Sequence, residues 1–183
     1  RNIRVIERAP HGKEGPWNTT ARMPILRSPK HLTGPDLGVP SLTFRAWYEA
    51  QHGRDGWARL YKIARLDWLD YLLWVREVVG LPVENGLALQ TLEPAGDLLR
   101  ARLSSGELVH ARKVVMANGR DGAGGFRWPR FPSFDPADPK RRGLVFHTLE
   151  DIDFDRLAGK RIGVLGVLAT AIDNAATALE AGA

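Results

Sequence analysis

One glycine near the end of the sequence lies where a phosphate group could bind. Gly166 follows a short apolar run, Arg161 to Leu165, and precedes a stretch of strong helix formers that begins at Ala169. An apolar strand that turns on glycine into a small-residue helix is typical of the start of a dinucleotide-binding βαβ unit. The turn gathers backbone N–H groups and the helix N-terminus at one point, which favours a bound pyrophosphate. The pattern therefore predicts a nucleotide site at Gly166.

An acid near the start of the sequence is placed for a contact with a ribose. Residues 2–7 form a short β-branched run that ends in Glu7. In dinucleotide folds the second strand ends in an Asp or Glu that accepts hydrogen bonds from ribose hydroxyls, about 20 residues after the glycine turn. That turn would precede residue 1. Without such a context, Glu7 is simply a solvated strand end.

The loop after Glu7 contains glycines, an aromatic ring and arginines. Gly15 and Trp17 lie in its first part, and Arg22 and Arg27 follow in a long irregular segment. Trp17 either covers a planar cofactor or fills the core. The two arginines either steady a phosphate or a peroxide, or they are ordinary surface or ion-paired side chains. Long irregular segments inside compact domains are often functional, so the loop is a candidate part of a site.

Composition excludes several classes of site and partner. The 183 residues include no Cys, which rules out disulfides, cysteine-ligated zinc, iron–sulfur clusters and dithiol chemistry, and we expect no metal. The net charge of +5 is mild, and no pattern supports a nucleic-acid partner. No apolar run approaches the roughly 20 residues that span a bilayer, and no signal peptide is recognised. We expect a cytoplasmic protein that acts on a small molecule, away from membranes, and composition predicts no oligomeric state.

Helices and short strands must position these residues. Helices are expected over about 41–51 and 67–79, the second with Asp67 as its N-cap, and their Trp-rich stripe is expected to be core. Strands are expected over 83–92, 98–103 and 108–115. These strands would form a β-meander that ends in Ala117-Asn118-Gly119. A Pro-rich connector then leads to the strand and helix around Gly166.

The order of these features resembles the flavoproteins that bind two dinucleotides. Within them it is similar to the flavin-containing and Baeyer–Villiger-type monooxygenases and to related FAD/NAD(P)-dependent oxidoreductases. The resemblance covers essentially all of the sequence, as an internal fragment of a typical member. It implies an α/β fold, namely a partial FAD/NAD(P)-binding, Rossmann-like, three-layer fold with a β-meander and a helical insert.

The resemblance also implies a domain organisation. Residues 1–119 would be a partial FAD-binding domain without its first strand and glycine motif, with the helical insert at about 41–80 and the β-meander at about 83–117. Residues 120–158 would be an interdomain connector. Residues 159–183 would be the start of an NAD(P)-binding domain.

Residue by residue, the resemblance implies a set of FAD contacts. Glu7 matches the acid that holds the FAD ribose. Gly15-Pro16-Trp17 is similar to the family's glycine–glycine–x–tryptophan segment beside the flavin, with Glu14 in place of one glycine. Arg27 belongs to the same irregular segment and is counted with the FAD contacts. Asn118-Gly119 lies where the family has Thr-Gly, at a strand end that touches FAD.

Two further motifs concern the connector and the second nucleotide. Gly143-x-x-x-His147 matches the core of a family fingerprint, with Arg141 for the leading Phe and Asp151 for the trailing aromatic residue, and His147 is expected to order the connector. Gly166 matches the first glycine of Gly-x-Gly-x-x-(Gly/Ala/Ser). Leu168 replaces the middle glycine, where a side chain crowds the pyrophosphate. FAD and NADP are thus the implied cofactors, and Leu168 predicts weakened NADP binding.

The implied function is that of a flavin-dependent oxidoreductase. In its simplest form it is an NAD(P)H-dependent monooxygenase in which an FAD C4a-peroxide transfers oxygen to a substrate, and no catalytic residue is assigned. One alternative is an NAD(P)H-dependent flavin reductase or oxidase of the same architecture. Another is a non-catalytic, truncated or degenerate flavoprotein fragment. The isolated 183-residue chain is expected to be inactive.

Overall fold

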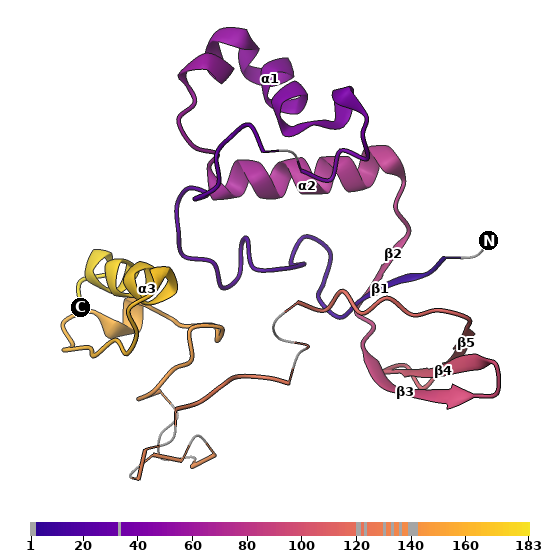
Figure 1. Cartoon of the computed structure of the whole chain (residues 1–183). Helices are drawn as coiled ribbons and strands as arrows, with labels where there is room; N and C mark the ends of the chain where they lie inside the picture. The colour runs from indigo at the N-terminus through magenta and orange to yellow at the C-terminus, as the bar shows by residue number, and fades with distance from the viewer. Residues whose placement is uncertain are drawn as a thin grey trace. The chain divides into compact units, whose positions relative to one another are not determined.

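Two compact units make up the described part of the chain (Figure 1). The computed structural model describes residues 3–32, 34–119, 122, 124–129, 131–132, 134–135, 137–138 and 143–183. One unit contains Arg1–Asn18 and Pro24–Ala117, and the other contains Thr19–Met23 and Asn118–Ala183. The chain therefore crosses between the units three times. Arg141, which departs from the family fingerprint, lies outside the described residues.

The first unit begins with a short parallel pair of strands. β1 (Val5–Glu7) pairs with β2 (Val83–Asn85), and Glu7 is the register partner of Asn85. Gly86 follows β2 with a φ of +77°, a conformation that favours glycine, and turns the chain out of the pair. The single strand predicted over 83–92 is therefore two strands. Parallel pairing places the carboxyl ends of β1 and β2 at one edge, where Glu7 and Asn85 lie.

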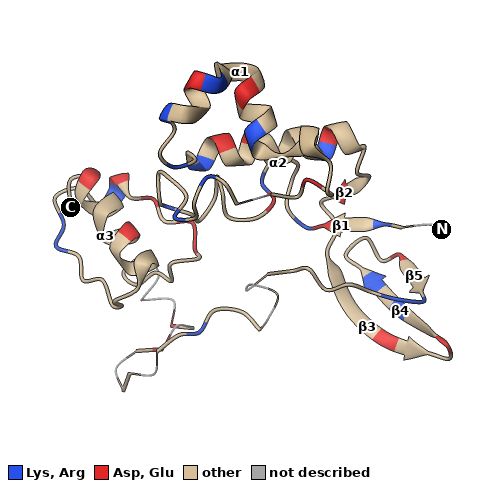
Figure 2. Ribbon diagram, turned by 45° about the horizontal axis from the view of Figure 1, so that its top comes forward, with Lys and Arg blue, Asp and Glu red and all other residues tan. Residues whose placement is uncertain are grey.

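The predicted β-meander is confirmed, although its last strand is shorter than expected. β3 (Leu89–Ala95), β4 (Leu98–Leu103) and β5 (Leu108–Ala111) pair antiparallel in that order. Figure 2 shows opposite charges on β3 and β4, where Arg100 pairs with Glu93 at 2.8 Å. The prediction of a strand to residue 115 is wrong. The ladder with β4 ends at Ala111, no described strand continues it, and Val115 is 87 % exposed.

Two helices form the predicted helical insert. A short 3-10 turn, η1 (Pro40–Leu42), precedes α1 (Phe44–Arg59), and the Thr43 hydroxyl caps α1 by accepting a hydrogen bond from Ala46 N. α2 (Arg65–Val79) ends at Gly80, whose left-handed conformation is typical of a helix C-terminus. Arg65 N donates to the Pro24 carbonyl at 2.9 Å, which fixes the start of α2. Asp67, which the sequence predicts as the N-cap, therefore lies inside the first turn of α2, and the N-cap is Ala64.

Aromatic rings fill the space between α1 and α2. Phe44 and Tyr71 are almost completely buried, and their ring centroids lie 5.3 Å apart. The Tyr71 hydroxyl donates to the Leu42 carbonyl at 2.7 Å, so its one polar atom is satisfied. Four tryptophans contact this pair of rings: Trp47, Trp57, Trp68 and Trp74. The predicted aromatic core is confirmed.

The long helix in the described part of the second unit is α3 (Ala169–Glu180), which begins where the sequence predicts. A 3-10 turn, η4 (Asp155–Leu157), precedes it. The strand predicted over 161–165 is not formed, which corrects that prediction. A strand needs a neighbour that accepts its ladder hydrogen bonds, and no described segment pairs with these residues.

Neither a membrane span nor a metal cluster occurs in the described part of the chain. Every helix there is too short or too polar to cross a bilayer. Among the same residues, no group of three or more His, Asp or Glu side chains is arranged to hold a metal ion.

Candidate functional site

Glu7 lies at the carboxyl end of β1, at the edge of the parallel pair. Its Oε1 atom accepts a hydrogen bond from Ala9 N at 2.8 Å, which holds the half-buried side chain in its own turn. Its carbonyl accepts from Leu87 N at 3.1 Å. No donor among the described residues bonds to the second carboxylate oxygen. A carboxylate held in this way can accept hydrogen bonds from hydroxyl groups of a ligand.

The loop from Gly12 to Asn18 is closed by its own hydrogen bond. Asn18 Nδ2 donates to the Gly12 carbonyl at 2.7 Å, and this bond also fixes the orientation of the amide. Gly12 and Gly15 have φ angles of +78° and +69°, so the loop uses glycine at both turns. The Oδ1 atom of Asn18 is buried and has no donor within the described residues. Because a buried acceptor without a donor is costly, a hydroxyl or a water at this atom would stabilise the loop.

Glu14 joins the loop to two other elements. Its Oε1 atom accepts hydrogen bonds from Arg76 Nη1 on α2 at 2.5 Å and from Asn85 Nδ2 on β2 at 2.7 Å. Asn85 Nδ2 also donates to the Ala9 carbonyl at 2.9 Å, and Arg76 Nη2 donates to Asn85 Oδ1 at 2.9 Å. We refer to Glu14, Arg76 and Asn85 as the loop clamp. The clamp connects the loop to the end of β2, which is the strand that pairs with β1.

The clamp keeps the Glu14 carboxyl group charged. Burial raises its pKa, but the hydrogen bonds from Asn85 and Arg76, together with the nearby backbone N–H groups of Glu14 and Gly12, outweigh burial and hold the pKa below its usual value. The Oε2 atom is buried and has no donor in the described part of the chain. The Glu14 side chain thus points to Arg76 and Asn85, although the sequence places it where the resembling family has glycine.

Trp17 lies against the aromatic core. Its ring meets the Trp68 ring edge-on, with centroids 6.3 Å apart and an interplanar angle of 73°. The Trp17 carbonyl accepts a hydrogen bond from Arg65 Nη1. The side chain is half-buried, so one part of the ring packs as core while the rest is accessible. This placement accommodates both roles that the sequence leaves open for Trp17.

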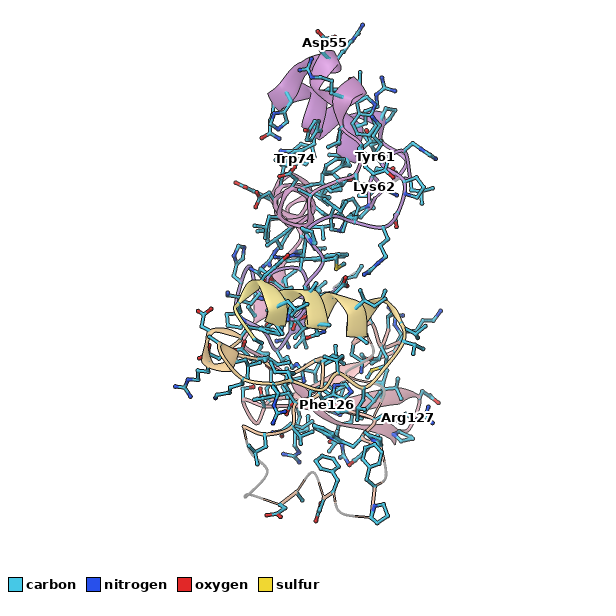
Figure 3. The ribbon with its side chains drawn as sticks, turned by 90° about the vertical axis from the view of Figure 1, so that its left-hand side faces the viewer. Asp55, Tyr61, Lys62, Trp74, Phe126 and Arg127 are labelled. Atoms are coloured by element: carbon cyan, nitrogen blue, oxygen red, sulfur yellow. The ribbon has the colours of Figure 1, made fainter. Side chains whose placement is uncertain are left out.

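Arg27 is an exposed residue of the segment that runs beside the start of α2. Its carbonyl accepts a hydrogen bond from Lys62 Nζ at 2.6 Å. Figure 3 shows Lys62 next to Tyr61, in the link between α1 and α2. The backbone of Arg27 is therefore held by this link, and the residue as a whole is exposed.

Arg22 belongs to the second unit and is occupied by contacts within it. Its guanidinium group donates to the Thr19 carbonyl at 2.5 Å and to the Glu150 carbonyl at 3.2 Å. The same group lies 5.3 Å from the centre of the Phe154 ring. Arg22 thus contacts residues Glu150 and Phe154, which sequence reasoning missed because Glu150 lies 128 residues away.

His147 packs among aromatic rings of the second unit. Its ring stacks on Phe126 at a centroid distance of 4.5 Å, and Trp128 meets it edge-on. Its Nδ1 atom accepts a hydrogen bond from Leu149 N at 3.2 Å, and its backbone N–H donates to the Glu150 carboxylate. Figure 3 labels Phe126, whose ring covers one side of the imidazole.

Asn118 and Gly119 form a tight turn in the second unit. Gly122 N donates to the Asn118 carbonyl at 3.1 Å, and Gly119 has a φ of +58°. A Cβ atom on Gly122 would lie 2.1 Å from Asn118 Nδ2, so glycine is required there. The other predicted FAD contacts, Glu7, Gly15, Trp17 and Arg27, belong to the first unit.

Gly166 lies in close contact with α3. Its φ is +145°, and a Cβ atom at this position would lie 2.9 Å from Ala171 Cβ. Leu168 is the N-cap residue of α3, and its carbonyl accepts a hydrogen bond from Ala171 N at 2.9 Å. Its side chain is 78 % exposed and caps no backbone group. An apolar side chain therefore occupies the helix end at which an anion would approach.

Comparison with known proteins decides the family. The family described as FAD-NAD(P)-binding matches residues 1–121. The chain belongs to this family. A curated relative, the FAD-dependent urate hydroxylase of Xanthomonas campestris pv. campestris, is 48 % identical over 183 residues. That match covers 99 % of the chain and 38 % of the relative, so the chain spans well under half the length of this relative.

Two solved structures are also similar to this FAD-NAD(P)-binding chain. They are a flavin-containing monooxygenase from Stenotrophomonas maltophilia and a mutant flavin monooxygenase from the same organism. Each is 23 % identical, has a TM-score of 0.44, and is matched over 59 % of this chain and 28 % of its own.

The family membership confirms the resemblance and the α/β, FAD/NAD(P)-binding fold class. FAD is supported both by the family description and by the name of the relative. NADP in particular stays a prediction, and so do the individual cofactor contacts and the domain boundaries.

The residues of the first unit fit a ligand that is rich in hydroxyl groups, as FAD is. Among the described residues, no donor bonds to the second carboxylate oxygen of Glu7, and none bonds to the buried Oδ1 atom of Asn18. Both acceptors match the ribose and ribityl hydroxyls of FAD in hydrogen-bond polarity. Sequence reasoning missed Asn18, Arg76 and Asn85, whose residue types carry no signal until the fold places them near the loop.

Proposed function

We propose that this chain is part of a flavin-dependent monooxygenase that uses FAD and a reduced nicotinamide nucleotide. The observation that carries the proposal is the Glu7 carboxylate at the carboxyl end of β1, beside a glycine-containing loop with an unsatisfied buried acceptor. The family and the 48 % identical FAD-dependent relative support the cofactor. The protein is proposed to be cytoplasmic and to act on a small molecule.

In this proposal the two nucleotides have separate sites. Glu7, Gly15, Trp17, Arg27, Asn118 and Gly119 would contact FAD, and Gly166 would contact NADP. Residues 1–119 would belong to the FAD-binding domain, 120–158 would connect, and 159–183 would begin the NAD(P)-binding domain.

The residues of this chain bind, orient and shield, while the redox chemistry is that of the cofactor. Bound FAD, once reduced by NAD(P)H, supplies the activation of O2. Glu7 accepts hydrogen bonds from ribose hydroxyls, and the positive φ of Gly15 lets the backbone approach the ligand closely. Trp17 presents an apolar ring that excludes water. The exposed Arg27 guanidinium offers a positive charge to a phosphate group.

The substrate is proposed from the relative alone. That relative is named for urate, so a purine-like heterocycle that can be hydroxylated is the substrate to test first.

The test uses the natural protein that carries this sequence. After purification, we expect bound flavin in its absorption spectrum and NAD(P)H oxidation that accelerates when urate is added. Stoichiometric hydroxylated product would support the monooxygenase. Hydrogen peroxide in place of product would indicate the oxidase alternative, and absence of flavin with added FAD would refute the proposal.

A further inference from the structure

Two side chains, Arg76 of α2 and Asn85 of β2, donate hydrogen bonds to one oxygen atom of the loop, Glu14 Oε1. We propose that the loop clamp of Glu14, Arg76 and Asn85 is a positioning device, which sets the distance between the ribose contact at Glu7 and the loop at Gly12–Asn18. The inference rests on the proposed FAD site. It assigns no contact with the ligand to the clamp residues, which act through the loop.

Asn85 links the two halves of the site. It is the register partner of Glu7 in the parallel pair, so its backbone position is fixed by the strand that carries the ribose contact. Its side-chain Nδ2 atom reaches the Ala9 carbonyl at 2.9 Å and Glu14 Oε1 at 2.7 Å. One residue thus holds the strand end, the start of the loop and the middle of the loop.

Arg76 supplies the charge that fixes this arrangement. Its Nη1 atom donates to Glu14 Oε1 at 2.5 Å, and its Nη2 atom donates to Asn85 Oδ1 at 2.9 Å and to the Val83 carbonyl at 3.4 Å. The side chains of Arg76 and Glu14 are only 18 % and 23 % exposed. Charge-assisted hydrogen bonds with this degree of burial are stronger and more directional than surface ion pairs.

The clamp holds the middle of a loop that has no regular secondary structure. Residues 8–18 form no helix or strand, and the hydrogen bond from Lys13 N to the Pro10 carbonyl is local. The Asn18–Gly12 bond closes the loop on itself and does not attach it to the sheet. At the end of the loop the Trp17 carbonyl accepts a hydrogen bond from Arg65 Nη1. The clamp is the long-range attachment of the middle of the loop, and we infer that it sets where Gly12 and Gly15 lie relative to Glu7.

A device that sets a spacing affects ligands according to their length. FAD spans both halves of the site, so it gains from a preset distance because less loop ordering is required on binding. AMP engages only the ribose half and gains nothing from the position of the loop. If the clamp only stabilised the fold, its loss would lower the fraction of folded protein and so weaken the binding of FAD and of AMP alike.

The experiment measures dissociation constants of FAD and of AMP in the natural protein, freed of flavin, and in its Glu14→Ala and Asn85→Ala variants. We expect FAD binding to weaken by about tenfold or more in each variant, with AMP binding changed less than about twofold. Glu14→Gln keeps an acceptor oxygen for Asn85 and Arg76, so it should recover most of the lost FAD affinity. Glu93→Ala removes a carboxylate from an exposed ion pair in the β-meander and is the matched control.

The outcomes separate this inference from the proposed function. If the parent protein binds no FAD, the proposed function fails. If it binds FAD but both variants bind FAD as tightly as the parent, the clamp has no positioning role. Equal weakening for FAD and AMP would also overturn the inference, because it would indicate a general loss of folded protein, which urea unfolding of each variant checks directly.

Discussion

Replacing Gly34 by alanine would test how tightly the aromatic core is packed beside the site. A Cβ atom at this position would lie 2.8 Å from Trp68 Cη2, 2.8 Å from Tyr71 Cε1 and 2.9 Å from the Tyr71 hydroxyl oxygen. These distances are shorter than real Cβ contacts, so something must move. Tyr71 has no exposed surface, which leaves its ring no open space to enter. Gly34→Ala must therefore displace packed rings or the backbone that carries residue 34.

The size of the effect follows from two contributions. Overpacking a well-packed core costs roughly 1 to 3 kcal/mol. Shifting Tyr71 would also weaken its hydroxyl bond to the Leu42 carbonyl, now 2.7 Å long, and a hydrogen bond of this type contributes about 1 kcal/mol. We expect Gly34→Ala to lower the free energy of unfolding by roughly 2 to 4 kcal/mol. That is a large share of the total stability of an ordinary domain.

Urea unfolding followed by tryptophan fluorescence would measure this loss. Gly163→Ala is the control, because a Cβ atom there meets nothing within 4 Å and the residue does not have a positive φ. A Gly34→Ala protein within about 0.5 kcal/mol of the parent, the range of ordinary surface substitutions, would refute the packing argument. Since Trp68 also contacts Trp17, displaced rings should weaken flavin binding in the natural protein as well.

Three further predictions concern the nucleotide turn, the loop clamp and the end of α1. Leu168→Gly should lower the KM for NADPH by roughly five- to tenfold, equivalent to about 1 kcal/mol, because it removes the exposed leucine side chain from the N-terminus of α3. An unchanged KM would contradict the argument that this side chain crowds the pyrophosphate. Because the pKa of folded Glu14 is lowered, its stabilisation is complete above the unfolded value of 4.5 and is lost as the pH falls through the folded pKa. The stability difference between parent and Glu14→Gln should therefore shrink in acid unfolding curves below pH 4.5, and a constant difference would count against the clamp. Lys30→Met removes an ammonium group that donates to the Trp57 carbonyl at 2.6 Å and lies 4.7 Å from the centre of the Trp57 ring. Urea unfolding should show that the free energy of unfolding falls by about 1 to 2 kcal/mol. An unaltered unfolding midpoint would show that these contacts add nothing to stability.

Elements with local signals were predictable from the sequence. The α2 helix ends at Gly80 because glycine takes the left-handed conformation there at little cost. The turns around Gly96 and Gly106 separate the strands of the β-meander for a similar reason, since both glycines have positive φ. These features depend on neighbouring residues, so a reading of the chain in order recovers them.

Elements that depend on distant partners were not predictable. The mostly apolar runs at 114–117 and 161–165 favour strands, but a strand forms only beside another that shares its hydrogen bonds. Within the described residues neither segment has such a neighbour. The pattern shows that these segments are suited to a sheet and does not show which residues would pair with them.

Within the candidate site, residues with local signals were likewise predictable, and residues that depend on distant partners were not. Glu7, the loop glycines and Gly166 were found because strand, turn and helix signals flank them. The direction of the Glu14 side chain was not found, because its partners Arg76 and Asn85 lie 62 and 71 residues away. A glutamate where the family has glycine predicts that the backbone approaches a ligand less closely. In the structure the side chain of that glutamate bonds to Arg76 and Asn85.

Arg22 has a consequence for anyone who divides this protein by cloning. The short segment Thr19–Met23 lies near the start of the sequence but belongs to the same compact unit as the residues after Ala117. A clone that stops at Ala117 would leave Arg22 without the Glu150 carbonyl and the Phe154 ring. A clone that starts at Asn118 would lose the guanidinium group that holds those two residues. The boundary between the units is therefore not a single cut in the gene, and a clone of the second unit would need residues 19–23 added to it.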